Sequence, residues 1–263
     1  MRGIVTAILL VGCGRVDFVD RDKGSDASIS DSVDAVGPTV VYVISAAGTT
    51  ENLLTLDPAT GELTMVAAFS GVGTIGGLAY WDANTLYATS FDPNEILELT
   101  LSPSALVSIG TYTGNIASLE RDGNVLIGTD DTTNDLVTID PTNGTLTRMV
   151  LHDASDTTRA SQGGDVVAMP DGTWYWYSNS GTQLYVLEPA TALATAVGGP
   201  ATGAPFVSGM FRDDSGHLFV TSSGSQQQIE IDTTTGQLGA AITLCLACPT
   251  VYPLGSGDAT RTP

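Results

Sequence analysis

Hydrophobic and polar residues alternate in short runs along most of this chain, and turn-forming residues separate the runs. Alternation with a period of two is typical of strands that bury one face. One phrase, LTLDPATGELT at residues 54–64, returns as VTIDPTNGTLT at 137–147 and as EIDTTTGQL at 230–238. Weaker copies lie at 99–106 and 185–192. The chain is therefore predicted to be a β-protein with an internal repeat.

Each copy of the phrase predicts a strand, a tight turn and a second strand. The Asp side chain accepts hydrogen bonds from the turn amides, and Pro sets φ at the first corner. Gly takes the position with positive φ that brings the chain back. Thirty Gly and twelve Pro in 263 residues agree with many short strands and many turns.

The predicted strands form sets of four that recur at intervals of roughly 44 residues, as expected for the blades of a β-propeller. They are 40–46, 52–57 and 63–69; 76–81, 85–91, 96–101 and 106–112; 116–121, 125–130, 136–140 and 146–152; 164–169, 173–178, 183–188 and 194–198; and 207–212, 217–222, 227–232 and 238–244.

The first set lacks its inner strand, and the end of the chain offers a candidate for it. Residues 254–260 echo residues 162–167, which open another set. Pairing of this last strand into the first blade would close the ring and remove an open sheet edge. We therefore predict an all-β propeller of five four-stranded blades over residues 39–263, with six blades as the alternative.

The N-terminus is predicted to be a targeting segment. Met1 and Arg2 precede a short apolar run from Gly3 to Val11. The sequence Leu10-Val11-Gly12-Cys13 resembles the lipobox of bacterial lipoproteins, which implies that Cys13 is lipidated. The alternative is an ordinary signal peptide with an incidental cysteine.

On this interpretation residues 1–12 are a lipoprotein signal peptide and residues 13–38 are a flexible acidic tether. Several acyl chains hold a protein firmly on a bilayer. We expect an exported protein of the cell envelope, at the outer membrane or the cell surface, that meets the membrane through its lipid anchor only.

The formal net charge is −20, and Lys23 is the only lysine. Binding of phosphate needs clustered Lys and Arg, so the charge argues against nucleic acids and anionic lipid surfaces as partners. It is compatible with divalent cations. Most of the Asp residues lie at predicted turns, where hydrogen bonding to the turn accounts for them.

Four carboxylates are candidate metal ligands. Asp92 and Asp130 lie at the ends of second strands of their blades, on the face where blade-to-blade connections lie, and Asp165 and Asp258 follow a Gly at equivalent positions of inner strands. Carboxylates on separate loops are ligands of the kind that Ca²⁺ needs. The alternative is that they cap turns or bond to amides of neighbouring blades. No other cofactor is expected.

No residue is assigned a catalytic role. His152 and His217 lie in different blades, without a nucleophile setting such as Gly-x-Ser-x-Gly, and are predicted to be surface residues. Arg159 and Arg212 are two basic residues that could meet an anionic ligand.

Cys245 and Cys248 form a C-x-x-C in a chain predicted to be exported, so we expect a local disulfide between them. A redox motif would normally lie near a βαβ unit, which the pattern does not predict, and zinc would need two further ligands.

Second strands of the sets begin with a pair such as Leu-Tyr, and the repeated phrase follows later in the same set. This combination resembles bacterial exported β-propellers of the quinoprotein-like, NHL and YVTN kind. The resemblance covers residues 39–263 and implies the fold. The Asp-x-x-Thr-Gly segments also resemble part of the tryptophan-docking repeat of PQQ dehydrogenases, but no copy has Trp where that repeat needs it. The calcium-dependent lactonases of the SMP-30 kind use a central site of carboxylates and Asn.

Two functions from different classes follow. The favoured one is a monomeric, non-enzymatic binding or scaffolding module that holds an envelope protein or a glycan. A structural repeat module with no small-molecule ligand cannot be separated from it by sequence. The alternative is a calcium-dependent hydrolase, lactonase or lyase that uses carboxylates at the mouth of the propeller channel.

Overall fold

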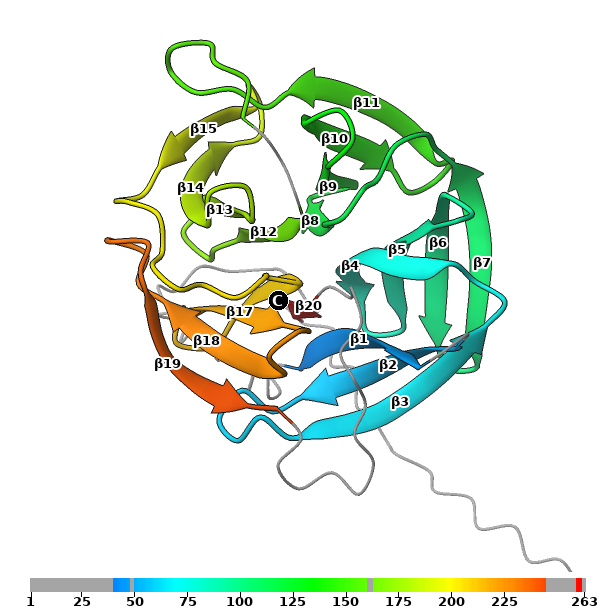
Figure 1. The fold of residues 1–263 in the computed structure, drawn as a ribbon. Helices are drawn as coiled ribbons and strands as arrows, with labels where there is room; N and C mark the ends of the chain where they lie inside the picture. Colours follow the sequence, from blue (N-terminus) through cyan, green and yellow to red (C-terminus); the bar gives the residue numbers. More distant parts are fainter. Residues whose placement is uncertain (1–39, 48–49, 160–162, 245–258, 262–263) are drawn as a thin grey trace, which may run out of the picture. The chain divides into compact units, whose positions relative to one another are not determined.

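The computed structural model describes residues 40–47, 50–159, 163–244 and 259–261. These residues form five four-stranded antiparallel sheets arranged as the blades of a ring, so the predicted five-bladed propeller is confirmed (Figure 1). The predicted signal peptide and tether lie outside the described residues and stay predictions. None of the described residues forms a helix long and apolar enough to cross a membrane.

The blades follow one another along the chain, each running from the inner to the outer strand, and β20 completes the first. The strands of blade 1 are β20 (Ala259–Arg261), β1 (Val41–Ala47), β2 (Thr50–Leu56) and β3 (Leu63–Ser70). Those of blade 2 are β4 (Thr74–Asp82), β5 (Thr85–Phe91), β6 (Glu95–Leu101) and β7 (Ser104–Thr111). Those of blade 3 are β8 (Glu120–Asp122), β9 (Val125–Asp130), β10 (Asp135–Asp140) and β11 (Thr145–Val150). Those of blade 4 are β12 (Gly164–Ala168), β13 (Trp174–Ser178), β14 (Gln183–Glu188) and β15 (Leu193–Ala196). Those of blade 5 are β16 (Gly209–Arg212), β17 (Leu218–Ser222), β18 (Gln227–Ile231) and β19 (Leu238–Thr243).

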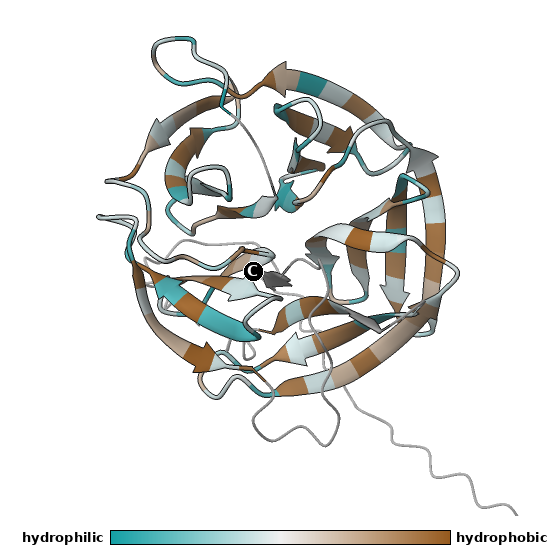
Figure 2. Ribbon diagram, viewed as in Figure 1, coloured by the Kyte–Doolittle hydropathy of each residue, from teal (hydrophilic) through white to brown (hydrophobic). Residues whose placement is uncertain are grey.

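The hydrophobic core is divided into clusters that lie between neighbouring blades. Ile44 of blade 1 packs in one cluster with Leu78 of blade 2, and Val41 of blade 1 packs in another with Phe211 of blade 5. Figure 2 shows hydrophobic and polar residues alternating along many of the strands. Each blade presents apolar side chains to a neighbour, because an isolated sheet cannot bury them alone.

The turns of the repeated phrase have the chemistry that the sequence predicts. The Asp57 carboxylate accepts hydrogen bonds from the Ala59 amide at 2.9 Å and from the Thr60 hydroxyl at 2.8 Å. The hydroxyl of Thr60 and then the amide of Ala59 lower the pKa of Asp57. Gly61 has φ of 76° and donates its amide to the Asp57 carbonyl at 2.8 Å.

The ring closes as predicted. β20 pairs antiparallel with β1, with Arg261 opposite Val41 and Ala259 opposite Val43. The last strand of the chain thus supplies the inner strand of the first blade, and β1 has a partner on both sides.

Several predicted strands are shorter in the structure, and the largest difference is in blade 3. The pattern predicts one inner strand over residues 116–121, but β8 begins only at Glu120. The Ser118 hydroxyl accepts a hydrogen bond from the Thr129 amide at 2.9 Å. The Thr129 amide therefore donates to a side chain instead of to a main-chain carbonyl of the neighbouring strand, which interrupts regular strand pairing at this position.

Candidate functional site

Polar residues at the ends of second strands hold the connections that lead into the next blade. Asn94 donates its side-chain amide to the Gly114 carbonyl at 2.6 Å. Asn179 makes two bonds with Val207, one from its amide to the carbonyl and one from the Val207 amide to its own oxygen, both at 2.8 Å. These residues occur on the face on which the candidate ligands were predicted.

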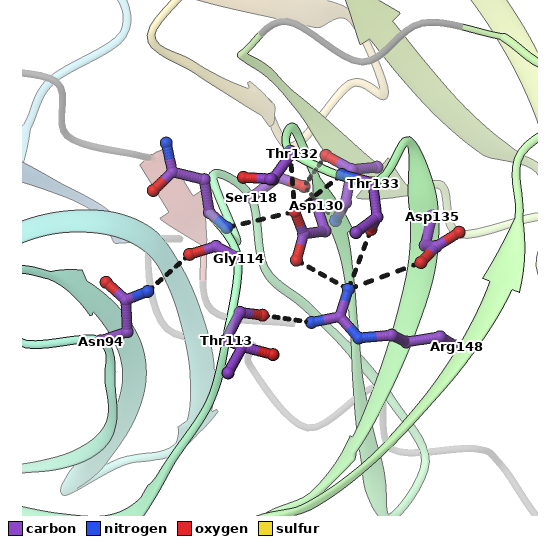
Figure 3. A network of polar contacts seen from close by, with 11 residues as sticks. Asn94, Thr113, Gly114, Ser118, Asp130, Thr132, Thr133, Asp135 and Arg148 are labelled. Carbon is purple, nitrogen blue, oxygen red and sulfur yellow. Dashed lines mark hydrogen bonds and ion pairs between the residues drawn. The ribbon is translucent and has the colours of Figure 1, made fainter.

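Asp130 is the centre of the largest of these networks (Figure 3). Its carboxylate accepts hydrogen bonds from the amides of Asn115 at 3.1 Å and Thr132 at 2.8 Å. The Arg148 guanidinium lies 2.7 Å from the same carboxylate and 3.5 Å from that of Asp135. Asp130 comes from β9 and Asn115 from the connection between blades 2 and 3, so the network ties the two blades together.

The charge state of Asp130 follows from these contacts. Its side chain is fully buried, and burial alone would raise its pKa. The hydrogen bonds from the Asn115 amide and from Arg148 outweigh that effect, and the pKa of Asp130 lies below its ordinary value. Asp130 is therefore an ionised carboxylate whose oxygens already have protein donors.

Asp165 is also buried and bonded to main-chain amides. It accepts hydrogen bonds from its neighbour Val166 at 2.7 Å and from Met210 at 2.6 Å. Because Met210 lies on β16, the second bond joins the inner strands of blades 4 and 5. Asp165 thus bonds to an amide of a neighbouring blade, which is the alternative to metal binding given above.

The other two candidate ligands have different surroundings. Asp92 is exposed at a corner with φ of 51°, where its amide donates to the Asn94 side chain at 3.2 Å. Asp258 lies outside the described residues, as do Cys13, Cys245 and Cys248. Within the described part of the chain, no three His, Cys, Asp or Glu side chains are grouped so that they could hold a metal ion. The calcium site and the disulfide stay predictions.

The two histidines lie apart, each beside acidic or carbonyl groups. The His152 ring nitrogens lie 3.0 Å from the Asp153 carbonyl oxygen and 3.1 Å from that of Thr191. His217 is exposed and its ring lies 3.0 Å from the Asp213 carboxylate. The contact with Thr191 joins the segment of His152 to the turn between β14 and β15, whereas the contact of His217 lies within the turn between β16 and β17.

A small cavity opens on the same face, where connections enter the inner strands. Its volume is about 90 Å³, roughly that of three water molecules. Two aromatic rings, Phe91 and Phe206, line it, and Phe206 is 58% exposed. The remaining lining residues are Asn115, Ala117, Asp131, Gly163, Gly164, Val207 and Ser208.

Polar groups around this cavity are already bonded across the connections. Asp131 accepts a hydrogen bond from the Gly163 amide, and the hydroxyl of Ser208 donates to that of Ser223 at 2.7 Å. What the cavity offers to a ligand is therefore chiefly apolar surface. Sequence reasoning did not select Phe206, because a single aromatic residue between Pro and Val carries no sign of whether it is exposed.

Comparisons with known proteins confirm the fold. No protein-family model and no characterised protein sequence matches the chain. The structure is similar to a chain in the crystal structure of a nidogen/laminin complex, with a TM-score of 0.56 and 13% identity over 85% of this chain and 98% of that one. It is also similar to glutaminyl cyclase from Myxococcus xanthus, with a TM-score of 0.52 and 16% identity over 68% of this chain and 80% of that one. At these identities the likeness concerns the β-propeller fold alone.

Proposed function

We propose that this chain is an exported, lipid-anchored protein of the bacterial cell envelope whose propeller binds another protein without catalysing a reaction. The observation that carries the proposal is the apolar cavity beside the exposed ring of Phe206. Aromatic side chains, Phe among them, are enriched at the cores of protein interfaces.

The size of the cavity favours an apolar side chain of a partner over a whole small molecule. Pockets for small molecules usually exceed about 300 Å³, and this one measures about 90 Å³. The rigid frame around it also suits binding, since Asn179 fixes the position of Val207 beside Phe206. A preformed surface loses little conformational entropy when a partner docks.

Photo-crosslinking in the native cells tests the proposal. A benzophenone amino acid is placed at Phe206 in the full chain, and a matched chain carries it at Val107, which is 55% exposed on the outer strand β7. We expect a discrete protein adduct from position 206 and none of the same mass from position 107. Adducts at neither position, the same adducts at both, or an adduct with glycan alone would overturn the proposal.

A further inference from the structure

Basic residues are few in the propeller, and most of them occupy one kind of position. Residues 39–263 contain five, all of them arginines: Arg121, Arg148, Arg159, Arg212 and Arg261. Arg148 and Arg159 each form an ion pair with a carboxylate, Asp130 and Asp153 respectively. The other three lie on inner strands of different blades, which are β8, β16 and β20.

The pairing of the strands shows that these three positions are equivalent. Arg121 lies opposite Leu126, Arg212 opposite Leu218 and Arg261 opposite Val41. On the third strand of the same blade, these three partners lie opposite Ile139, Ile231 and Leu56, respectively. Each of these residues directly precedes the Asp of the repeated turn. Three blades therefore carry an arginine at one register position, at the end of the inner strands where the short Asp hairpins lie.

Arg121 and Arg212 make the same kind of contact with the preceding blade. Arg121 donates to the Trp81 carbonyl at the end of β4, and Arg212 donates from Nε to the Ala168 carbonyl of β12 at 2.9 Å. Arg121 also donates to the Gly123 carbonyl at 2.9 Å, and its guanidinium lies 4.3 Å from the centroid of the Trp81 ring. Bonds to carbonyl oxygens orient a guanidinium without cancelling its charge, because a carbonyl oxygen carries no formal charge.

The two arginines line one cavity of about 340 Å³, within the usual range for small-ligand sites. Tyr80 and Met169 add aromatic and apolar surface, and Glu120 is the only carboxylate among the lining residues. The lining thus carries a net positive charge in a chain whose formal net charge is −20. Burial lowers the pKa of Arg212, against the opposing effects of the Glu120 and Asp214 charges, as expected for a guanidinium that has lost part of its hydration.

We propose that this hairpin-side mouth of the ring binds a carboxylate group, held by Arg121 and Arg212. The planar fork of a guanidinium matches the two oxygens of a carboxylate. Stacking on Trp81 keeps the edge of the Arg121 guanidinium available for in-plane bonds. The carboxylate belongs to a small organic acid or to the C-terminus of a peptide. This site is separate from the cavity at Phe206, which lies where chain connections enter the inner strands.

Fluorine NMR tests this site directly. The full chain with Cys13→Ser is labelled with 5-fluorotryptophan, which gives a signal for each of its three tryptophans, and Trp81→Phe identifies the signal of Trp81. The probes are succinate, a tripeptide with a free C-terminus and the same tripeptide with an amidated C-terminus, all at constant ionic strength. We expect a saturable shift of the Trp81 signal with succinate or the free tripeptide, and none with the amidated one.

The two carboxylate probes distinguish the sources of the ligand: saturation by succinate alone indicates an organic acid, and saturation by the free tripeptide alone indicates a chain terminus. Arg212→Gln and Arg121→Gln should each weaken binding about tenfold or more, since each removes charge-assisted hydrogen bonds. Arg159→Gln makes the same change of charge elsewhere and should leave binding unchanged. If a Gln variant melts below the parent, Arg121→Lys and Arg212→Lys are used, which keep the charge and lose the fork.

The proposal is overturned by a shift that does not saturate, by an equal shift with the amidated tripeptide, or by an equal loss of binding in Arg159→Gln. An absence of any shift with both carboxylate probes would overturn it as well. None of these results bears on the crosslinking at Phe206, so the two proposals fail independently.

Discussion

Gly61 of the first blade lies so close to Thr243 of the last blade that a Cβ atom at position 61 would come within 2.7 Å of the Thr243 carbonyl oxygen. The turn of the repeated phrase therefore serves two purposes. It reverses the chain within blade 1, and it brings the backbone against the outer strand of blade 5. Gly144 and Gly236 have the same relationship to neighbouring blades, since a Cβ atom there would lie 2.9 Å from the Ile109 carbonyl oxygen and 2.5 Å from that of Val197, respectively.

Replacement of Gly61 by Ala should destabilise the ring. A positive φ costs a residue with Cβ about 1 to 2 kcal/mol, and the clash with Thr243 adds to it. Gly216→Ala is the matched control, because Gly216 has φ of 81° and nothing within 4 Å of a Cβ atom. Urea unfolding should give a larger loss of unfolding free energy for Gly61→Ala. Equal losses would show that the contact with Thr243 contributes nothing.

Arg148→Gln should weaken the contact between blades 2 and 3. It leaves the buried Asp130 carboxylate without its cation, which we expect to cost about 2 to 3 kcal/mol at pH 7. Thr133→Val removes only a hydroxyl that accepts a bond from the same guanidinium at 3.0 Å, and should cost less. Urea unfolding of both variants measures the two losses of unfolding free energy.

The same pair predicts a dependence on pH. Because the pKa of Asp130 is lowered in the folded protein, its stabilising effect is present above the unfolded pKa of about 4 and is lost as pH falls through the folded value. The difference in unfolding free energy between the parent and Arg148→Gln should therefore shrink in acid. A difference that stays constant from pH 7 to pH 3 would contradict the role of the ion pair.

His152 should make stability depend on pH in the opposite direction. Its two ring nitrogens face the carbonyl oxygens of Asp153 and Thr191, and only the protonated ring donates to both. These bonds, first that of Asp153, raise the pKa of His152, and the nearby Asp156 carboxylate acts in the same direction.

The stabilising effect of His152 is present below its unfolded pKa of about 6.5 and is lost as pH rises through the higher folded value. The melting temperature of the parent should exceed that of His152→Gln by more at pH 6 than at pH 9. A difference that grows toward pH 9 would show that the neutral ring makes the important contact.

Calcium should leave the melting temperature unchanged relative to EDTA. Asp130 is occupied by Arg148 and main-chain amides, and Asp165 by the amides of Val166 and Met210. A ligand at about 100 times its dissociation constant stabilises a protein by roughly 2.7 kcal/mol, which a thermal scan detects easily. A rise with millimolar Ca²⁺ but not with Mg²⁺ would support the calcium site and bring the hydrolase alternative forward.

The sequence by itself determined the blade. The three clear copies of the phrase each contain their own Asp, Pro or Thr, and Gly, so the turn and the pairing of its two strands depend on residues within about ten positions of one another. The echo of residues 162–167 near the C-terminus also predicted the ring closure, because register-equivalent strands carry similar patterns. The shortened β8 was missed, since the Ser118 side chain that accepts the Thr129 amide looks like an ordinary strand residue in sequence.

Only the tertiary structure decided what the polar residues of the two faces do. Asp130 and Asp165 are candidate ligands by sequence, and their donors come from a neighbouring connection and a neighbouring blade. The arginines of β8 and β16 are 91 positions apart (212 − 121) and line one cavity only because the ring brings their strands together. Contacts between blades depend on the packing of distant segments, and a local pattern of residues does not encode their partners.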